Sequence, residues 1–391
     1  MRLALTAEQE AFRDEVRSYF GALITPDLRV ELDRDDPDSP AYREFVRQLG
    51  ADGWLCPTWP VEYGGRGLTP IEQFVFFDET QRLRVPMPFL TTNTVGPTIQ
   101  AYGTEEQKQE FLPRILAGDC LFSIGYSEPG AGTDLASLTT RAVREGDEWV
   151  INGQKMWTSI IHRADYVWLA CRTDPDAPKH KGISILIVPT DADGFSWTEV
   201  DTIGGGLTSA TYYEDVRVPV DNCVGGVNNG WTLMTAQLNQ ERIALSSSGV
   251  IERRLTEVIR WARSASAGDG GRVIDVDWVQ RRLAEVRARL AALRMLNWKV
   301  AWAYSQGSIA PADASTMKVY GSHFYIDAYR ALMEVVGTAS TMTAAASGAV
   351  LQGELEEEMR RSIILTFGGG TNEIQRDIIA TLGLGMPRPP R

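Results

Sequence analysis

The sequence predicts an α+β protein with an N-terminal helical domain (residues 1–118), a central β-barrel or sandwich domain (119–226) and a C-terminal four-helix bundle (227–391). The first part carries apolar residues at helical spacing, and past Gly118 this period gives way to short β-prone runs. From Trp231 onward the helical pattern returns and stays. A chain of 391 residues is long enough for such domains to share well-filled cores.

The first domain contains two clear helix starts. Thr6 followed by Gln9 has the form of a capping box. A single apolar stripe follows it, made of Phe12, Val16, Tyr19 and Phe20. Thr104 and Gln107 repeat the capping pattern ahead of a helix that is predicted to run to about Leu112.

The central part is predicted to form several short strands. Asn152-Gly153 lies between β-prone flanks in the run from Trp149 to Trp157, and this dipeptide is typical of a hairpin turn. Further strands are predicted over residues 166–171, 183–188 and 210–218, with Pro or Gly near several of their ends. Together they indicate a small β-barrel or sandwich of about 100 residues.

Four long amphipathic segments follow, over residues 231–264, 276–306, 311–336 and 350–366. Gly, Pro or Ser separates each segment from the next. Helices of this length with short connections favour an antiparallel bundle. The predicted order along the chain is therefore helical, then β, then helical.

Charge and hydropathy exclude several classes of protein. The formal net charge of −12 offers no basic surface to a phosphate backbone, so we expect no nucleic-acid binding. The longest apolar runs, such as Ile183 to Pro189, are too short to span a membrane. Because the N-terminus also lacks the basic and apolar regions of a signal peptide, we expect a cytoplasmic protein without membrane contact.

The cysteines and histidines suggest no cross-link and no metal site. Four cysteines lie far apart, without a Cys-x-x-Cys pair: Cys56, Cys120, Cys171 and Cys223. This spacing predicts free thiols in a reducing compartment. The three histidines are too few and too scattered to form a zinc site.

Three motifs carry the functional signal. The first is Ile124-Gly-Tyr-Ser-Glu-Pro-Gly-Ala-Gly-Thr133-Asp134, a loop whose glycines let backbone amides approach a planar or anionic group. The second is Asn152-Gly-Gln-Lys-Met-Trp157-Thr-Ser159, and the third is Phe367-Gly-Gly-Gly370-Thr371-Asn-Glu373-Ile-Gln375-Arg376. In this order the three motifs resemble those of the acyl-CoA dehydrogenase family, and they span most of the chain.

The resemblance implies bound FAD and an acyl-CoA substrate. It places Tyr126 and Ser127 against the flavin ring. Trp157 would flank the ring, and the Ser159 hydroxyl would lie near flavin N5. Thr133 would bond phosphates of FAD or of CoA, as a cofactor or substrate contact. The other FAD positions implied by the motifs are Ile124, Gly369, Gly370, Thr371 and Glu373, the last two at the adenosine portion.

The catalytic base is predicted on the helix that begins near Trp231. The commonest family pattern places its catalytic glutamate where this chain has Gly369. One helix face carries Met234, Leu238, Glu241 and Leu245. A carboxylate in an apolar stripe has a raised pKa, which suits a base that removes a carbon-bound proton. Glu241-Arg242 also resembles the minority branched-chain and long-chain pattern, and a merely structural pairing of the glutamate with an arginine is the alternative.

The resemblance implies a dehydrogenation across Cα–Cβ of the acyl thioester. Glu241 would take the α-proton while FAD takes the β-hydride, which gives a trans-2-enoyl-CoA and passes electrons to an electron-transfer flavoprotein. The Gly369 amide and a ribityl hydroxyl would stabilise the thioester oxygen. Arg242 would orient Glu241 or contact substrate. Two alternatives stay open: a flavin oxidase of the same fold, and a non-catalytic scaffold subunit.

One departure from the family concerns quaternary structure. Homotetrameric members carry Arg-x-x-Phe-Gly, whose arginine reaches the FAD pyrophosphate of a neighbouring subunit. The corresponding stretch here, residues 268–278, lacks Phe-Gly and contains Asp275 and Asp277, which would repel a pyrophosphate. Over residues 209–219, 237–242 and 364–370 the chain resembles the glutamate-bearing subunit of actinobacterial α2β2 steroid side-chain acyl-CoA dehydrogenases, so a related subunit is the expected partner. A homo-oligomer with relaxed FAD contacts is the alternative.

Overall fold

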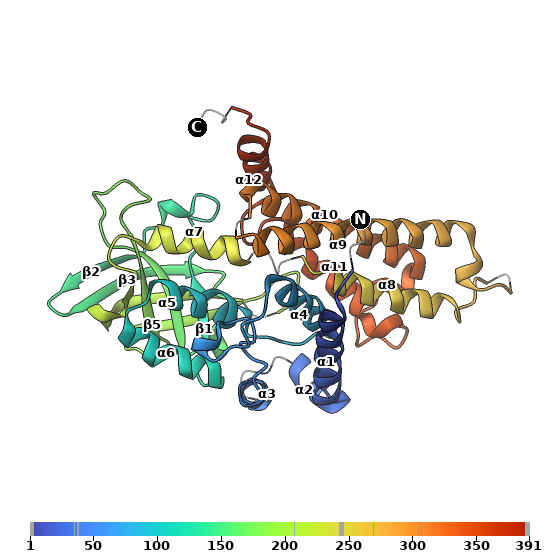
Figure 1. Ribbon diagram of the computed structural model, residues 1–391, viewed down its shortest axis with the longest axis horizontal. Helices are drawn as coiled ribbons and strands as arrows, with labels where there is room; N and C mark the ends of the chain where they lie inside the picture. Colours follow the sequence, from blue (N-terminus) through green and yellow to red (C-terminus); the bar gives the residue numbers. More distant parts are fainter. Residues whose placement is uncertain are drawn as a thin grey trace.

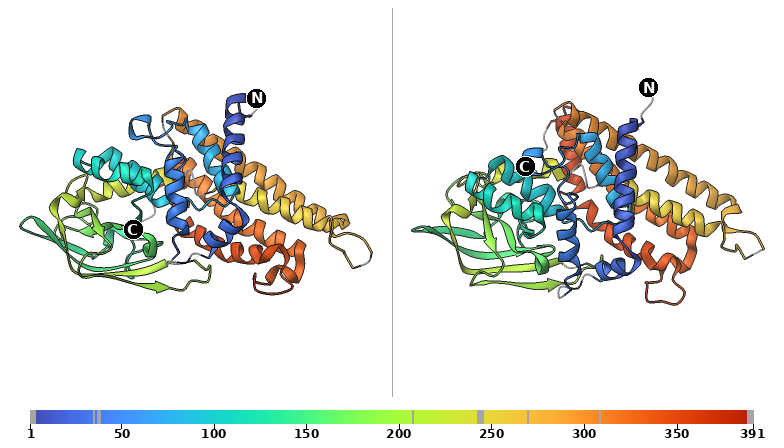
Figure 2. Two further views of the ribbon diagram at one scale, coloured as in Figure 1. Left: turned by 90° about the horizontal axis from the view of Figure 1, so that it is seen from below. Right: turned by 60° about the horizontal axis from the view of Figure 1, so that its bottom comes forward.

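The computed structural model describes residues 4–34, 36, 39–206, 208–241, 246–268, 270–307 and 309–387, and for residues 238–241 it describes the backbone alone. Its parts follow the predicted order of helices, β-sheet and helices (Figure 1). The N-terminal helices lie between the sheet and the C-terminal helices, which gives the molecule an elongated shape (Figure 2). The predicted fold class is confirmed.

The N-terminal part begins four of its helices at a capping threonine. Its elements are α1 (Ala7–Leu23), α2 (Pro26–Asp33), α3 (Ala41–Ala51), α4 (Pro70–Arg82), the π-helical turn η2 (Leu90–Val95), α5 (Gly96–Tyr102) and α6 (Glu105–Ala117). The predicted capping boxes at Thr6 and Thr104 are both present. α6 runs past its predicted end at Leu112, through Pro113, and stops where Gly118 takes a φ of 80°.

The described strands form one sheet in the order β6–β7–β3–β2–β4–β5–β8, with β1 added to β4 in parallel. They are β1 (Phe122–Gly125), β2 (Arg141–Glu145), β3 (Glu148–Met156), β4 (Tyr166–Arg172), β5 (Ile183–Pro189), β6 (Phe195–Val200), β7 (Thr208–Pro219) and β8 (Cys223–Val224). The three separately predicted strands correspond to β4, β5 and β7.

Strand β4 is buried on both faces, which explains its continuous apolar run. Val167, Leu169 and Cys171 point into an inner core, while Trp168 and Ala170 pack in the core shared with the N-terminal helices. Side chains of β5 and β7 reach the same inner core, although three strands separate them in the sheet. The sheet therefore curls round its own core.

The hairpin predicted at Asn152-Gly153 is wrong. Strand β3 runs straight through these residues, and the chain turns between β2 and β3 at Gly146, where φ is 64°. At Gly153 the pairing of β3 with β7 shifts register, and a Cβ there would lie 2.6 Å from Thr140 Oγ1. The glycine therefore permits a bulge and a close approach, not a turn.

The C-terminal part corrects a second prediction. Its helices are α7 (Gly230–Glu241), α8 (Ser248–Ala262), α9 (Asp277–Ser305), α10 (Pro311–Val336), α11 (Glu354–Ser362) and α12 (Asn372–Ile378). The single helix predicted over 231–264 is thus divided into α7 and α8. Ser247 has extended backbone and caps α8, and the Asp78 carboxylate of α4 accepts hydrogen bonds from the Ser247 hydroxyl and the Gly249 amide.

The two halves of the predicted helix have different neighbours. α7 lies along the sheet, against β5, η2 and α5, whereas α8 packs with α9 and α10 in the helical bundle (Figure 1). Among the described residues, none of the helices has both the length and the apolar character needed to cross a membrane. The four cysteines are free thiols, as predicted.

Candidate functional site

The structure brings the first two motifs together beside β1. The Met156 amide donates to the Ser127 carbonyl at 2.8 Å, which joins the loop after β1 to the end of β3. The Ser123 hydroxyl donates to the Ser159 carbonyl at 2.6 Å. The stretches that carry Ser127 and Ser159, two predicted flavin contacts, are therefore held side by side.

A buried ion pair fixes the first of these stretches. Lys155 on β3 is fully buried, and its Nζ lies 2.9 Å from Glu128 Oε1 and 3.0 Å from the Tyr126 carbonyl oxygen. Glu128 also accepts hydrogen bonds from the backbone amides of Thr139 and Thr140, at 2.7 and 2.8 Å. Burial acts to raise the pKa of Glu128, but the Lys155 ammonium and these hydrogen bonds lower the pKa to about 2.

The side chains at this place fit a flat ring with polar edges. Trp157 leaves 55% of its surface exposed, and its φ of 66° is unusual for a residue with a bulky side chain. Its neighbours Ile124, Tyr126, Ser127 and Ser159 are half-buried. An exposed indole beside hydroxyl groups is suited to contact an isoalloxazine ring.

A chain of hydrogen bonds joins this loop to α7. The Trp168 indole N–H donates to the Tyr126 hydroxyl oxygen at 3.1 Å, and the Tyr126 hydroxyl donates to Gln237 Oε1. Trp168 and Gln237 are buried. The helix that was predicted to carry the base is thus bonded to the loop that was predicted to contact flavin.

The predicted base lies at the end of that helix. α7 ends at Glu241, four residues after Gln237, and Met234 on the same helix is buried as predicted. The side chain of Glu241 and the whole of Arg242 lie outside the described residues. The roles given to these two residues therefore stay predictions.

The third motif is held by α10. Lys318 is buried and donates to the Gly370 carbonyl, and its Nζ lies 3.3 Å from Asn372 Oδ1. The Asn372 amide in turn donates to Ser322 at 2.9 Å. Gly369 and Gly370 have φ values of 67° and 99°, so a side chain at either position would be strained. This backbone disfavours a catalytic glutamate at position 369.

The remaining predicted contacts lie on the bundle side or at the surface. Thr371 caps α12 by accepting from the Ile374 amide at 3.3 Å, and Glu373 and Thr133 are exposed. Within the part of the chain that the structure describes, no hydrogen bond or ion pair joins residues 369–373 to the first two motifs. The predicted site is thus gathered in two groups.

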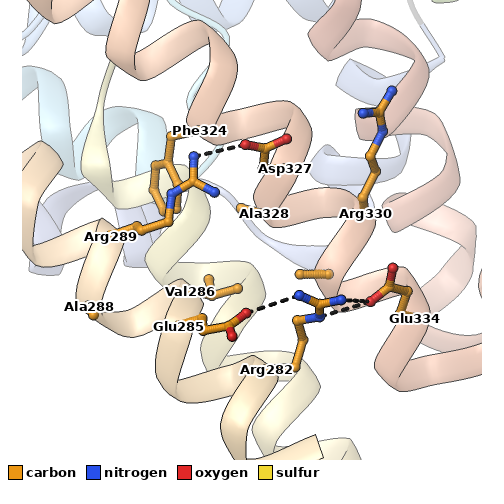
Figure 3. A pocket seen from close by; sticks show the side chains of 11 residues that line it. Arg282, Glu285, Val286, Ala288, Arg289, Phe324, Asp327, Ala328, Arg330 and Glu334 are labelled. Carbon is orange, nitrogen blue, oxygen red and sulfur yellow. Dashed lines mark hydrogen bonds and ion pairs between the residues drawn. The ribbon is translucent and has the colours of Figure 1, made fainter. Parts of the chain in front are cut away.

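A groove of about 440 Å³ between α9 and α10 contains none of these residues (Figure 3). Arg282 lies between Glu285 and Glu334, at 3.0 and 2.6 Å, and Arg289 pairs with Asp327 at 2.9 Å. Because these charges are matched within the groove, it does not resemble a site for phosphate or for another anion. The motifs, not this groove, define the candidate active site.

Comparison with known proteins identifies the family. The family models for the N-terminal, middle and C-terminal domains of acyl-CoA dehydrogenases match residues 6–119, 123–216 and 228–383 of this chain. The acyl-CoA dehydrogenase FadE26 of Mycobacterium tuberculosis is 54% identical, with 100% of both chains covered. The chain belongs to the acyl-CoA dehydrogenase family. It is an acyl-CoA dehydrogenase, and enzymes of this family typically depend on FAD.

Two solved structures share the entire fold of this acyl-CoA dehydrogenase. One chain of the ChsE4-ChsE5 complex from Mycobacterium tuberculosis is 56% identical, with a TM-score of 0.94 and 100% of both chains covered. One chain of the Tcur3481-Tcur3483 steroid ACAD is 52% identical, again with a TM-score of 0.94 and 100% of both chains covered. Both relatives are thus complexes of two different proteins.

Sequence reasoning missed the residues that support the site. Lys155 and Glu128 stand inside the first two motifs, and this position was the available signal in the sequence. Their burial is seen only in the structure. Gln237 and Lys318 gave no signal, since a polar residue on an amphipathic helix is ordinarily solvated. Only the packing of α7 and α10 against other parts of the dehydrogenase shows that both are buried.

Proposed function

We propose that this acyl-CoA dehydrogenase uses FAD to convert an acyl-CoA thioester into a trans-2-enoyl-CoA, with Glu241 as the base. One observation carries the proposal. The loop with the predicted flavin contacts and the helix that ends at Glu241 are bonded together through Tyr126 and Gln237. A base on that helix would thus act beside a flavin on that loop.

Two residues of the chain would act on the thioester. Glu241 removes a proton from Cα, and its apolar helix face favours the high pKa that this step requires. The backbone amide of Gly369 donates to the thioester oxygen as negative charge develops on it. The positive φ of Gly369 supports a base on α7, because an acidic side chain at 369 would be strained.

The residues present fit FAD. Trp157, Ser127 and Ser159 would hold the isoalloxazine ring together with Tyr126 and Ile124, as argued from their exposure. The adenosine portion would contact Thr371 and Glu373, Gly370 would be a further FAD contact, and Thr133 would bond phosphates. When bound, FAD supplies the two-electron acceptor for the hydride that leaves Cβ. An electron-transfer flavoprotein is the proposed external acceptor.

The proposed substrate is a steroid side-chain acyl-CoA. A relative of the same length and fold is named as a steroid ACAD. Three consecutive glycines, 368–370, stand where the family commonly has a glutamate, which leaves room for a wide and rigid acyl group. Arg242 is proposed as a further substrate contact.

The proposed partner is a related acyl-CoA dehydrogenase subunit in an α2β2 heterotetramer. The two solved relatives are complexes of two different proteins. The stretch that corresponds to Arg-x-x-Phe-Gly contains Arg272, whose Nε lies 2.7 Å from Asp275 Oδ2. The Asp275 carboxylate beside this arginine would repel a neighbouring pyrophosphate, which supports a different subunit as the source of that contact.

Anaerobic bleaching of the flavin tests the proposed reaction. The purified enzyme, with and without the candidate partner subunit, is mixed with octanoyl-CoA, isobutyryl-CoA and cholanoyl-CoA, and absorbance near the flavin maximum is followed. We expect cholanoyl-CoA to bleach the flavin fastest. The Glu241→Gln variant should retain FAD and lose bleaching by about 10³-fold or more. Glu110→Gln, at an exposed glutamate of α6, serves as the matched control.

The same experiment separates the alternatives. Full bleaching by Glu241→Gln would remove this residue as the base. Rapid peroxide formation in air, without an electron-transfer flavoprotein, would indicate an oxidase. A chain that never binds flavin, alone or with its partner, would indicate a scaffold subunit.

A further inference from the structure

Lys318 on α10 is a buried cation to which the proposed reaction assigns no role. It is 3% exposed. Its ammonium donates to the Gly370 carbonyl, and its Nζ lies 3.3 Å from Asn372 Oδ1. Removing an ammonium from water costs several kcal/mol, and an apolar side chain of similar volume often serves the stability of a core as well. The burial therefore points to a function for the contacts that Lys318 makes.

The backbone that Lys318 contacts consists of two glycines with few other constraints. Gly369 and Gly370 lie between the short helix η9 (Ile363–Thr366) and α12, and both have positive φ. Within the described ranges, no hydrogen bond other than that from Lys318 reaches the backbone of these two residues. Because glycine has the widest choice of backbone conformations, this bond is what restricts the stretch.

The same face of α10 also anchors the start of α12. Ser315 donates to Gln375 Oε1 at 2.8 Å, and Asn372 Nδ2 lies 2.9 Å from Ser322 Oγ. These side chains are all buried, and residues three, four or seven apart share one face of a helix. The two serines hold side chains of α12, whereas Lys318 also holds the glycine backbone that precedes it.

We propose that Lys318 is a positioning residue for the backbone amide of Gly369, which it fixes through the Gly370 carbonyl. This inference rests on the proposed function, in which that amide donates to the thioester oxygen. Only the backbone torsions of the two glycines separate the amide from the carbonyl, so holding the carbonyl limits where the amide can point. Gly369 is exposed, and no group in the described part of the chain accepts a hydrogen bond from its amide. The amide is thus available to a ligand.

The bond should affect the rate more than the affinity for the thioester. A well-directed amide stabilises the enolate most, because negative charge develops on the thioester oxygen only as the α-proton leaves. A methionine at position 318 would lose the bond while filling nearly the same volume. Since Gly370 is exposed, water can replace the lost donor at its carbonyl, and we expect Lys318→Met to fold.

The test uses the FAD-loaded enzyme, with its partner subunit if one co-purifies, and the 3-thia analogue of cholanoyl-CoA or of the fastest thioester of the panel. Sulfur replaces Cβ in this ligand, so no hydride can leave, and the enolate formed by loss of the α-proton donates charge to oxidised flavin. The long-wavelength absorption of this complex at saturation measures enolate formation, and the titration gives Kd. For Lys318→Met we expect this absorption to fall about tenfold while Kd changes less than about threefold. Anaerobic bleaching by the substrate thioester should also slow about tenfold.

Two further variants serve as controls. Lys318→Arg retains a charged donor and should recover part of the absorption. Ser315→Ala loses a bond to α12 but none to the glycines, so its absorption should match the wild type. If Lys318→Met does not fold, Lys318→Gln takes its place with the same expected loss, because its side-chain donor is one bond too short for the Gly370 carbonyl.

Full long-wavelength absorption in Lys318→Met overturns the inference. An equal loss in Ser315→Ala does so as well, because the whole anchor of α12 would then be structural. Loss of FAD or of ligand affinity from Lys318→Met would make Lys318 a determinant of binding instead. A wild-type enzyme that shows neither the absorption nor bleaching by any thioester refutes the proposed function itself.

Discussion

At the residue scale, Lys155 and Glu128 are the pair on which the flavin-facing loop depends. Both side chains are buried, so replacing one of them leaves an unpaired charge in the protein interior. We expect Lys155→Met to lower the free energy of unfolding by about 3–5 kcal/mol and to release FAD. Urea denaturation at pH 7, followed by circular dichroism, measures the first effect, and absorbance of the purified protein measures the second.

The control for this prediction is an exposed pair. Lys179 and Asp134 lie 2.6 Å apart with more than half of each side chain exposed, so Lys179→Met should cost at most about 1 kcal/mol. The double variant Lys155→Met/Glu128→Leu removes both buried charges and should recover part of the loss. Equal free energies of unfolding for Lys155→Met and the wild type would contradict a stabilising role for the buried Lys155–Glu128 pair.

The same pair predicts a pH effect. The pKa of Glu128 is about 2 in the folded enzyme and about 4.3 in an unfolded chain. A lowered folded-state pKa stabilises the fold above pH 4.3, and this stabilisation is lost as the pH falls from 4.3 toward 2. Glu128→Gln lacks this titration, so the difference in urea midpoint between wild type and variant should shrink over that window. A constant difference would show that Glu128 does not titrate as described.

At the element scale, one buried arginine ties α8 to α11. Arg254 of α8 is 1% exposed and forms a two-pronged bond with Glu358, at 2.6 Å for each contact, and further pairs with Glu354 and Glu257. A planar guanidinium is the side chain that can satisfy several carboxylates at once. Arg253 also contacts Glu354 and Glu358, so two adjacent arginines of α8 hold α11.

We therefore expect Arg254→Met to destabilise the helical bundle by about 3 kcal/mol, because half-buried Glu358 loses its two-pronged partner and keeps only the single contact with Arg253 among its arginine pairs. Thermal and urea unfolding of the variant measure the change. Arg282→Met removes an arginine whose side chain is 40% exposed, and it should cost at most about 1 kcal/mol. If the two variants lost similar amounts of unfolding free energy, burial of the Arg254 network would add little to the stability of the bundle.

At the scale of the whole molecule, the C-terminal half presents apolar side chains to solvent. Met295 and Trp302, seven residues apart on α9, are each 61% exposed. Further exposed apolar residues in this half include Ile364, Phe367, Leu382, Leu384 and Met386. Apolar surface of this kind is typical of a protein–protein contact, and the proposed occupant is the related subunit.

We expect Trp302→Glu to separate the chain from its co-expressed partner, because a charge would be buried in the contact. Light scattering after size-exclusion chromatography gives the mass of each species. Trp197→Glu, at a 41% exposed tryptophan of β6, is the control and should leave the mass unchanged. A stable, yellow and active homo-oligomer of this chain alone would exclude the heteromer.

Local patterns of the sequence predicted much of the fold. The capping boxes at Thr6 and Thr104, the apolar stripe of α1 and the strands β4, β5 and β7 depend on neighbouring residues, and all of them are present. The predictions that failed depended on distant residues. Asn152-Gly153 forms a bulge against β7 and Thr140, and the helix over 231–264 is broken where Asp78 caps α8.

The sequence by itself determined the family, the order of the three parts and the three motifs, because each is encoded in short stretches of the chain. Only the tertiary structure decided that Glu128 and Lys155 form a buried pair and that Trp168, Tyr126 and Gln237 make a continuous chain of hydrogen bonds. Those contacts join residues up to 111 positions apart. Since burial and bonding over such separations arise only when the domains pack, no local pattern could indicate them.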